Sequence, residues 1–178
     1  MPNYVALLRA VNVGGTGKLP MTELAAMCAD AGFTNVKTYI ASGNVVFTCK
    51  QAERGVRAAL EQRLERYANQ HISVLVRTAE EITAVHRDNP FKRAAPNRTV
   101  AIFLNEAPSK DTLVKVKGRS TEEIALGARE FYVSYGDRMA DSKLRIPGAE
   151  LGTARNMNTI AKLASMATEL TPTKVGSR

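Results

Sequence analysis

Hydrophobic and polar positions in the first half of the chain change period several times, which predicts a mixture of strands and helices. The apolar run Tyr4–Ala10 has the length of a strand, whereas Met21, Leu24 and Cys28 recur at the spacing of a helix that Gly32 ends. The same criteria predict strands over 38–40, 45–48 and 73–77, and helices over 52–69 and 78–88. The predicted order is therefore βαββαβ followed by one helix.

The second half repeats this pattern less completely. Strands are predicted over 99–104, 123–126 and 131–135, a helix over 109–117, a short helical turn over 141–145, and a final helix from Asn156 onward. Asn89-Pro90 ends the last helix of the first half and marks the boundary. We therefore predict an α+β fold of two small ferredoxin-like units, residues 1–92 and 93–178, the second incomplete and ending in helices.

Several motifs resemble those of a bacterial family known as domain of unknown function 1697. They are Leu-Leu-Arg-Ala-Val-Asn-Val-Gly-Gly at 7–15, Lys-Leu-Pro-Met at 18–21, Tyr-Ile-Ala-Ser-Gly-Asn-Val-Val-Phe at 39–47, Asn-Pro-Phe at 89–91, Ser-Lys-Leu at 142–144 and Thr-Ala-Arg-Asn-Met-Asn-Thr at 153–159. The resemblance implies a two-part α+β fold related to ferredoxin-like units, and it implies no activity. This chain departs from the family at Met157, where tryptophan is usual, and it contains no tryptophan.

Charge is distributed unevenly along the 178 residues, whose formal net charge is +8. Residues 1–90 carry ten basic and eight acidic side chains, whereas residues 91–178 carry fifteen and nine. A basic second half favours an anionic partner, either nucleic acid or a phosphorylated small molecule. No apolar run reaches membrane-spanning length, and the N-terminus lacks a signal-peptide pattern, so we expect a cytoplasmic protein that does not enter a membrane.

The sequence offers no metal-binding, cofactor-binding or catalytic motif. Cys28 and Cys49 are predicted to be buried free thiols, and no cysteine or histidine pair has the spacing of a zinc site. The glycine-bearing segment 14–18 fails both the P-loop and the dinucleotide templates. Ser42 lacks the flanking glycines of a nucleophile elbow.

Two basic regions could nevertheless form one site. Glycine-rich turns and helix starts present free backbone amides, so the turn after the first strand and the start of the last helix both suit an anion. We hypothesise an anion-binding groove between the two units, with Lys143 and Arg145 on its rim. Its residues are Arg9, Asn12, Gly14, Gly15, Lys18, Lys143, Arg145, Arg155 and Asn156. The alternative is that Asn156 only caps its helix and the basic side chains are solvated.

We expect binding of an anionic partner, with nucleic acid first. The RNA-recognition pattern of aromatic residues and glycine is absent from residues 44–48. Two alternatives remain open: an enzyme acting on a phosphorylated or carboxylated metabolite in the same cleft, and a protein-interaction module. The sequence leaves the oligomeric state open.

Overall fold

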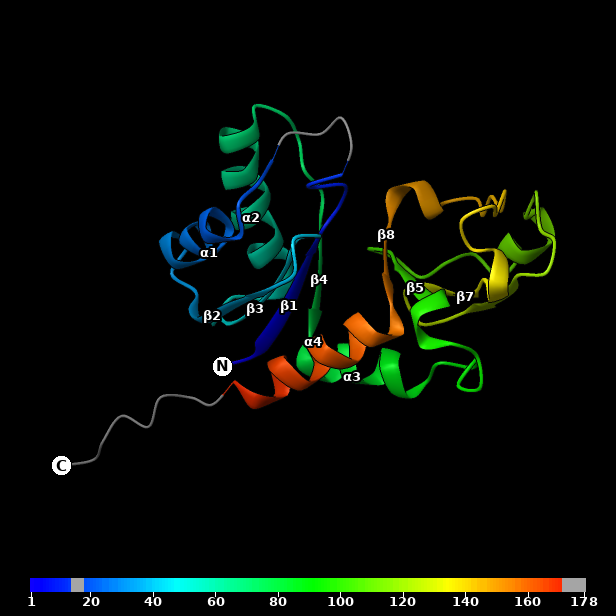
Figure 1. Cartoon of the computed structure of the whole chain (residues 1–178). Helices are drawn as coiled ribbons and strands as arrows, with labels where there is room; N and C mark the ends of the chain where they lie inside the picture. The colour runs from blue at the N-terminus through cyan, green and yellow to red at the C-terminus, as the bar shows by residue number, and fades with distance from the viewer. Residues whose placement is uncertain (14–17, 171–178) are drawn as a thin grey trace.

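The computed structural model describes residues 1–13 and 18–170. Within these residues the chain forms two four-stranded sheets and four α-helices (Figure 1). Neighbouring strands are antiparallel in both sheets. The predicted α+β fold class is confirmed.

The first sheet has the strand order β2-β3-β1-β4. Its elements along the chain are β1 (Asn3–Leu8), α1 (Met21–Asp30), β2 (Thr34–Tyr39), β3 (Asn44–Thr48), α2 (Glu53–Ala68) and β4 (Val74–Thr78). Leu24 of α1 and Leu60 of α2 pack on the face that carries Ala6 and Phe47. The opposite face is covered as well, so β1 is apolar at successive positions rather than at alternate ones.

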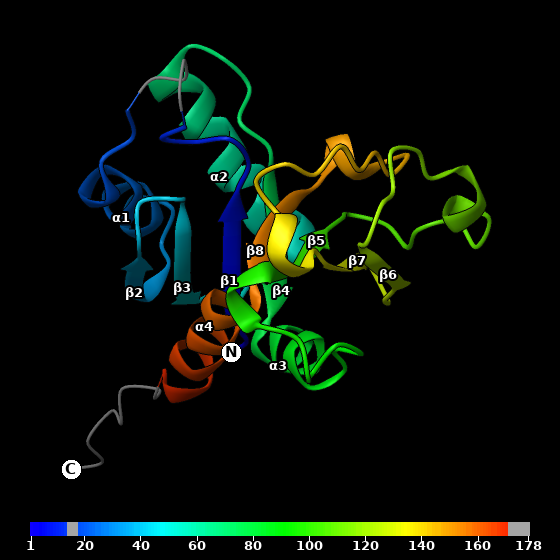
Figure 2. The same cartoon turned by 45° about the vertical axis from the view of Figure 1, so that its right-hand side comes forward.

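Helices α3 (Ala79–Arg87) and α4 (Met157–Glu169) cover that opposite face and lie side by side (Figures 1 and 2). Both helices are capped: Thr78 Oγ1 accepts from the amide of Glu81, and Asn156 Oδ1 accepts from the amide of Thr159. One apolar core joins the two helices to both sheets. Its members include Leu7, Leu75, Ile82, Phe103, Met157, Ile160 and Leu163. Met157 is therefore a core residue.

The second sheet has the order β6-β7-β5-β8. Its strands are β5 (Thr99–Phe103), β6 (Glu123–Leu126), β7 (Glu130–Ser134) and β8 (Thr153–Asn156). The segments between them contain only 3-10 helices, namely η2 (Thr112–Lys115), η3 (Gly136–Arg138) and η4 (Ala149–Leu151); a further one, η1 (Pro96–Arg98), precedes β5. The predicted boundary near residue 92 falls between the two sheets, but α3 and α4 share one core across it.

Two predicted helices and one strand differ from the structure. The helix expected over 109–117 is reduced to η2, because Leu113 and Val114 are exposed and no continuous apolar face of the segment is buried. The turn expected over 141–145 is extended instead, because Arg145 pairs with Lys117. Strand β8 was missed, since Thr153–Asn156 carries no apolar alternation.

The second sheet repeats the strand order of the first, with β5 to β8 in the places of β1 to β4. In each half the last strand runs directly into a helix, α3 or α4. The registers also correspond: Val5 lies opposite Val46 and Arg77, and Ala101 lies opposite Tyr132 and Arg155. The two halves are therefore an internal structural repeat in which the second copy lacks the helices that match α1 and α2.

Two smaller observations complete the description. Cys28 and Cys49 are buried free thiols, as predicted, and burial raises the pKa of Cys28 to about 12. Among the helices in the described ranges, none combines the length and the apolar character needed to cross a membrane.

Replacing Leu163 in the shared core tests the packing of α4 between the sheets. Leu163 is fully buried, so Leu163→Ala should lower the free energy of unfolding by about 2–5 kcal/mol. Leu151→Ala is the control, because Leu151 is 73% exposed and its change should stay within about 0.5 kcal/mol. Urea denaturation of both variants measures the difference, and equal midpoints would contradict the shared core.

Candidate functional site

Arg155 lies on β8, one residue before the cap of α4, and its side chain crosses from the second unit into the first. Its Nε donates to Asn44 Oδ1 at 2.6 Å, and its Nη2 donates to the carbonyls of Leu8 at 3.0 Å and Gly43 at 3.3 Å. Further acceptors are Ser42 O, Thr153 Oγ1 and Ala154 O. Desolvation lowers the pKa of Arg155 to about 10, so the guanidinium stays charged at neutral pH.

Arg77 on β4 makes the corresponding crossing from the first unit into the second. Its Nη2 donates to the carbonyls of Leu104 and Arg129, and its Nη1 donates to the carbonyl of Val76. Glu130 Oε2 lies 3.6 Å from Nη2, and the guanidinium carbon lies 5.4 Å from the centre of the Phe103 ring. Only 1% of Arg77 is exposed, and desolvation lowers its pKa.

Arg77 and Arg155, the seam arginines, occupy equivalent positions in the repeat. The strand registers match Leu8 with Leu104, and the turn before β3 with the turn before β7. Each guanidinium therefore binds the same two backbone carbonyls of the opposite unit. At residue 43 only glycine fits, because a Cβ would lie 2.6 Å from Val11 Cγ2 and φ is +88°.

Several residues of the predicted groove form hydrogen bonds within the protein, so their side-chain donors are not available to an anion. All N–H groups of Arg155 face protein acceptors, and Asn156 caps α4. Asn12 Oδ1 accepts from the amide of Leu19, while its Nδ2 donates to the carbonyl of Ala41. Arg155 could bind an anion only by giving up these hydrogen bonds, so this part of the hypothesis gains no support from the geometry.

The other predicted residues divide into two groups. Arg9 is exposed and donates from Nε to the carbonyl of Gly152 at 3.2 Å, which places it beside the second unit, and Lys18 is exposed. Gly14 and Gly15 lie outside the described residues. Anion binding at this turn stays a prediction.

Lys143 and Arg145 belong to a different surface, on the second unit. Arg145 pairs with Lys117 in an antiparallel bridge whose two amide-to-carbonyl hydrogen bonds measure 2.8 and 3.0 Å. Residues directly opposite each other present their side chains on one face, so two cations lie next to each other. Gly118 lets the neighbouring backbone approach, because a Cβ there would lie 2.0 Å from the carbonyl oxygen of Lys143. We call Lys117, Lys143 and Arg145 the cationic ladder.

The three side chains of the cationic ladder are exposed, and none has a hydrogen bond or an ion pair within the described residues. By contrast, Lys115 pairs with Asp111 at 2.8 Å, and Arg119 donates to the carbonyl of Glu122. The ladder therefore keeps its positive charge unpaired.

Glu122 joins the two segments that form the cationic ladder. Its Oε2 accepts from the amide of Ser120 and its Oε1 from the hydroxyl of Ser142, each at 2.6 Å. These hydrogen bonds, the one from Ser142 first, lower the pKa of the carboxyl group. Glu122 is 4% exposed and makes no ion pair with the ladder in the described structure.

A cavity of 720 Å³ adjoins the same segments. Lys115 and Pro147, each two residues from a ladder residue, line it, as do Ser73 of the first unit and the buried ring of Phe131. The cavity therefore opens between the two units, next to the ladder.

Sequence reasoning missed Lys117, Glu122 and Arg77. The run Lys115-Val116-Lys117-Gly118-Arg119 is a visible basic signal, but the predicted helix concealed its pairing with Arg145. Arg77 looked like an ordinary strand end, and its burial depends on contacts with residues 104 and 129.

These features define an α+β protein with an internal two-sheet repeat, reciprocal buried arginines and an exposed cationic ladder. The family model described as protein of unknown function (DUF1697) matches residues 1–132, and the chain belongs to that family. No curated protein matches it. A solved structure described as the conserved bacterial protein SP0830 from Streptococcus pneumoniae has a TM-score of 0.77 and 23% identity; the match covers 93% of this chain and 98% of that one. At this identity the likeness shows the fold alone.

Replacing Arg155 tests the reciprocal contact. Arg155→Ala leaves buried carbonyls without donors, so we expect a loss of unfolding free energy of about 3 kcal/mol. Arg66→Ala, on the exposed surface of α2, removes the same charge and should change stability by at most about 0.5 kcal/mol. Urea denaturation distinguishes them, and a stable Arg155→Ala variant would show that the seam does not depend on this side chain.

The hydrogen bonds to Glu122 predict a dependence on pH. Because its folded pKa lies below the unfolded value near 4.5, its stabilising effect is present above that pH and is lost as pH falls through the folded pKa. Wild type should therefore be more stable than Glu122→Gln at pH 7, and the difference should shrink at pH 3. Thermal unfolding at both pH values measures it, and a difference that is independent of pH would contradict the assignment.

Proposed function

We propose that this protein binds an anionic partner, nucleic acid first, through the cationic ladder of its second unit. The observation that carries the proposal is the direct pairing of Lys117 with Arg145 without an acidic partner among the described residues. This refines the groove expected from sequence, because Lys143 and Arg145 remain in the site and Arg155 does not.

Like charges directly opposite each other on neighbouring strands destabilise the fold. Here the fold brings Lys117 and Arg145 together, while Glu122 is held by neutral donors on Ser120 and Ser142. A phosphate placed between the two cations would replace their repulsion by two attractive ion pairs. The cost in the free protein and the gain in the complex therefore have the same origin.

The surrounding charge agrees with a polyanion. Residues 91–178 carry fifteen basic and nine acidic side chains, and the ladder is exposed rather than enclosed. An extended phosphate backbone can reach such a surface and release its counterions there.

A second candidate function rests on the adjoining cavity. Its volume of 720 Å³ lies within the range of small-molecule sites, and the ladder stands beside it. A phosphorylated or carboxylated metabolite could place its anionic group on the ladder and its remaining atoms against Phe131. This candidate predicts saturable binding of one small anion and a weaker dependence on salt.

Binding to fluorescent single- and double-stranded DNA and RNA at 50 and 200 mM salt tests the proposal. Wild type should bind at low salt and lose affinity steeply as salt rises. Lys117→Ala/Arg145→Ala should bind more weakly, and the slope of log K against log salt should become shallower by about 1.5 for two lost phosphate contacts.

The matched control is Arg54→Ala/Arg66→Ala, which removes two exposed cations from α2 and keeps the net charge equal to that of the ladder variant. It should retain nearly all the affinity. The ladder variant should also be at least as stable as wild type, because it removes a repulsion between two cations.

Equal weakening of binding by both double variants would mean that only the net charge of the protein matters, and it would contradict a binding site at the cationic ladder. Absence of binding at 50 mM salt would reject the nucleic-acid partner and leave the small anion as the candidate.

A further inference from the structure

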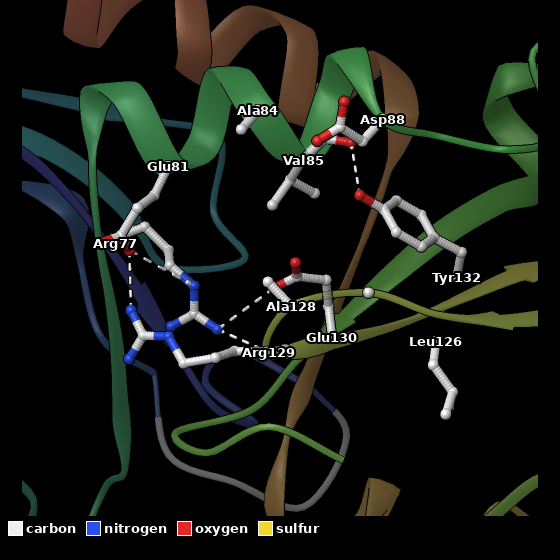
Figure 3. A pocket seen from close by; sticks show the side chains of 11 residues that line it. Arg77, Glu81, Ala84, Val85, Asp88, Leu126, Ala128, Arg129, Glu130 and Tyr132 are labelled. Atoms are coloured by element: carbon white, nitrogen blue, oxygen red, sulfur yellow. Dashed lines mark hydrogen bonds and ion pairs between the residues drawn. The ribbon is translucent and has the colours of Figure 1, made fainter. Parts of the chain in front are cut away.

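A second cavity at the seam has a different chemical character. It measures 530 Å³ and lies between α3 and the turn that precedes β7 (Figure 3). Arg77, Arg129, Glu81, Glu130 and Asp88 bring charged groups to its lining. Its apolar surface comes from Ala84, Val85, Leu126 and the ring of Tyr132.

Both arginines of this cavity are already held by acceptors of the protein. Arg129 donates to both carboxylate oxygens of Glu53, at 2.8 and 3.2 Å, and to Glu81 at 2.8 Å. Arg77 donates to the backbone carbonyls that hold the seam. Their positive charges are therefore committed to the protein.

Glu130 is the exception among the carboxylates. It is 3% exposed, yet its side chain makes no hydrogen bond within the described residues; its closest opposite charge is Arg77, at 3.6 Å. In the first unit the equivalent position is Asn44, which accepts from Arg155 Nε at 2.6 Å. In Figure 3 the Glu130 carboxylate lies between the arginines and Tyr132, and it points toward α3.

No fully enclosed side-chain oxygen lacks a hydrogen-bond partner in the described residues, so the Glu130 oxygens, which accept from no protein donor, are reached from the cavity. A ligand that enters the cavity can donate to them. The lining carries two positive and three negative side chains. Glu53 adds a negative charge behind Arg129 and Arg87 a positive one beside Asp88, which leaves a net charge of −1. A ligand that matches this cavity is therefore a cation that donates hydrogen bonds and also has an apolar part.

We propose that this cavity binds a small organic ammonium, whose N–H groups donate to Glu130 and whose apolar body packs between Val85, Leu126 and the ring of Tyr132. The phenol of Tyr132 donates to the carbonyl of Val85 at 2.8 Å, which holds the ring as a wall of the site. The site is independent of the cationic ladder and selects the opposite charge.

The test uses 2-phenylethylamine, which is an ammonium at pH 7, and 2-phenylethanol as its neutral counterpart. Ligand-observed and protein-observed NMR of the full chain should show that the amine binds and that the alcohol binds at least about tenfold more weakly, since one charge-assisted hydrogen bond is lost. The amine should shift the resonances of Val85, Leu126 and Tyr132.

Glu130→Gln keeps the shape of the side chain and removes the charge, so it should weaken amine binding at least about tenfold. Glu80→Gln is the matched control, because Glu80 is exposed on α3 outside this cavity and its loss should leave the affinity unchanged. Ala84→Leu fills the cavity without touching the ion pairs and should also reduce binding, which keeps the proposal testable if Glu130→Gln fails to fold.

Three results would overturn the proposal: equal affinity for amine and alcohol, unchanged binding by Glu130→Gln, or no shift at the three lining residues on adding the amine. The ladder variant Lys117→Ala/Arg145→Ala should bind the amine like wild type. A failure here is therefore distinguishable from a failure of anion binding.

Discussion

The arrangement of the two sheets depends on one interaction made twice: a buried guanidinium from each unit donates to backbone carbonyls of the other. Arg155 reaches Leu8 and Gly43, and Arg77 reaches Leu104 and Arg129. A planar group with several fixed donors can join a strand end and a turn at once, which a lysine cannot do. The shared core of α3 and α4 supplies the apolar area, and the seam arginines give the two units their register.

The differences between the repeated halves coincide with the candidate sites. The first unit covers one face of its sheet with α1 and α2, whereas the second has 3-10 helices and extended segments in those places. These segments carry the cationic ladder and the adjoining cavity. At the seam, Asn44 in one half is replaced by Glu130 in the other, which leaves a buried carboxylate facing the second cavity.

Local sequence signals predicted much of the first unit. Apolar runs and the glycine stop after α1 each act within a few neighbouring residues, and the structure confirms them. In the second unit the same holds for the start of α4 at Asn156. The same reasoning failed over 109–117, where Leu113 and Val114 stay exposed, and over 153–156, where a short strand is defined by its pairing with β5.

The sequence by itself determined the α+β class, the helix starts and the excess of basic residues in the second half. Only the tertiary structure decided what each basic residue does, because its role depends on partners far away along the chain. Arg155 appeared to be an open anion ligand, but residues 8 and 43 enclose it. Lys117 falls at the end of the helix predicted over 109–117, but its pairing with residue 145 places it in a ladder of like charges. Charge can be read from a sequence, whereas its neutralisation depends on the acceptors that folding brings within hydrogen-bonding distance.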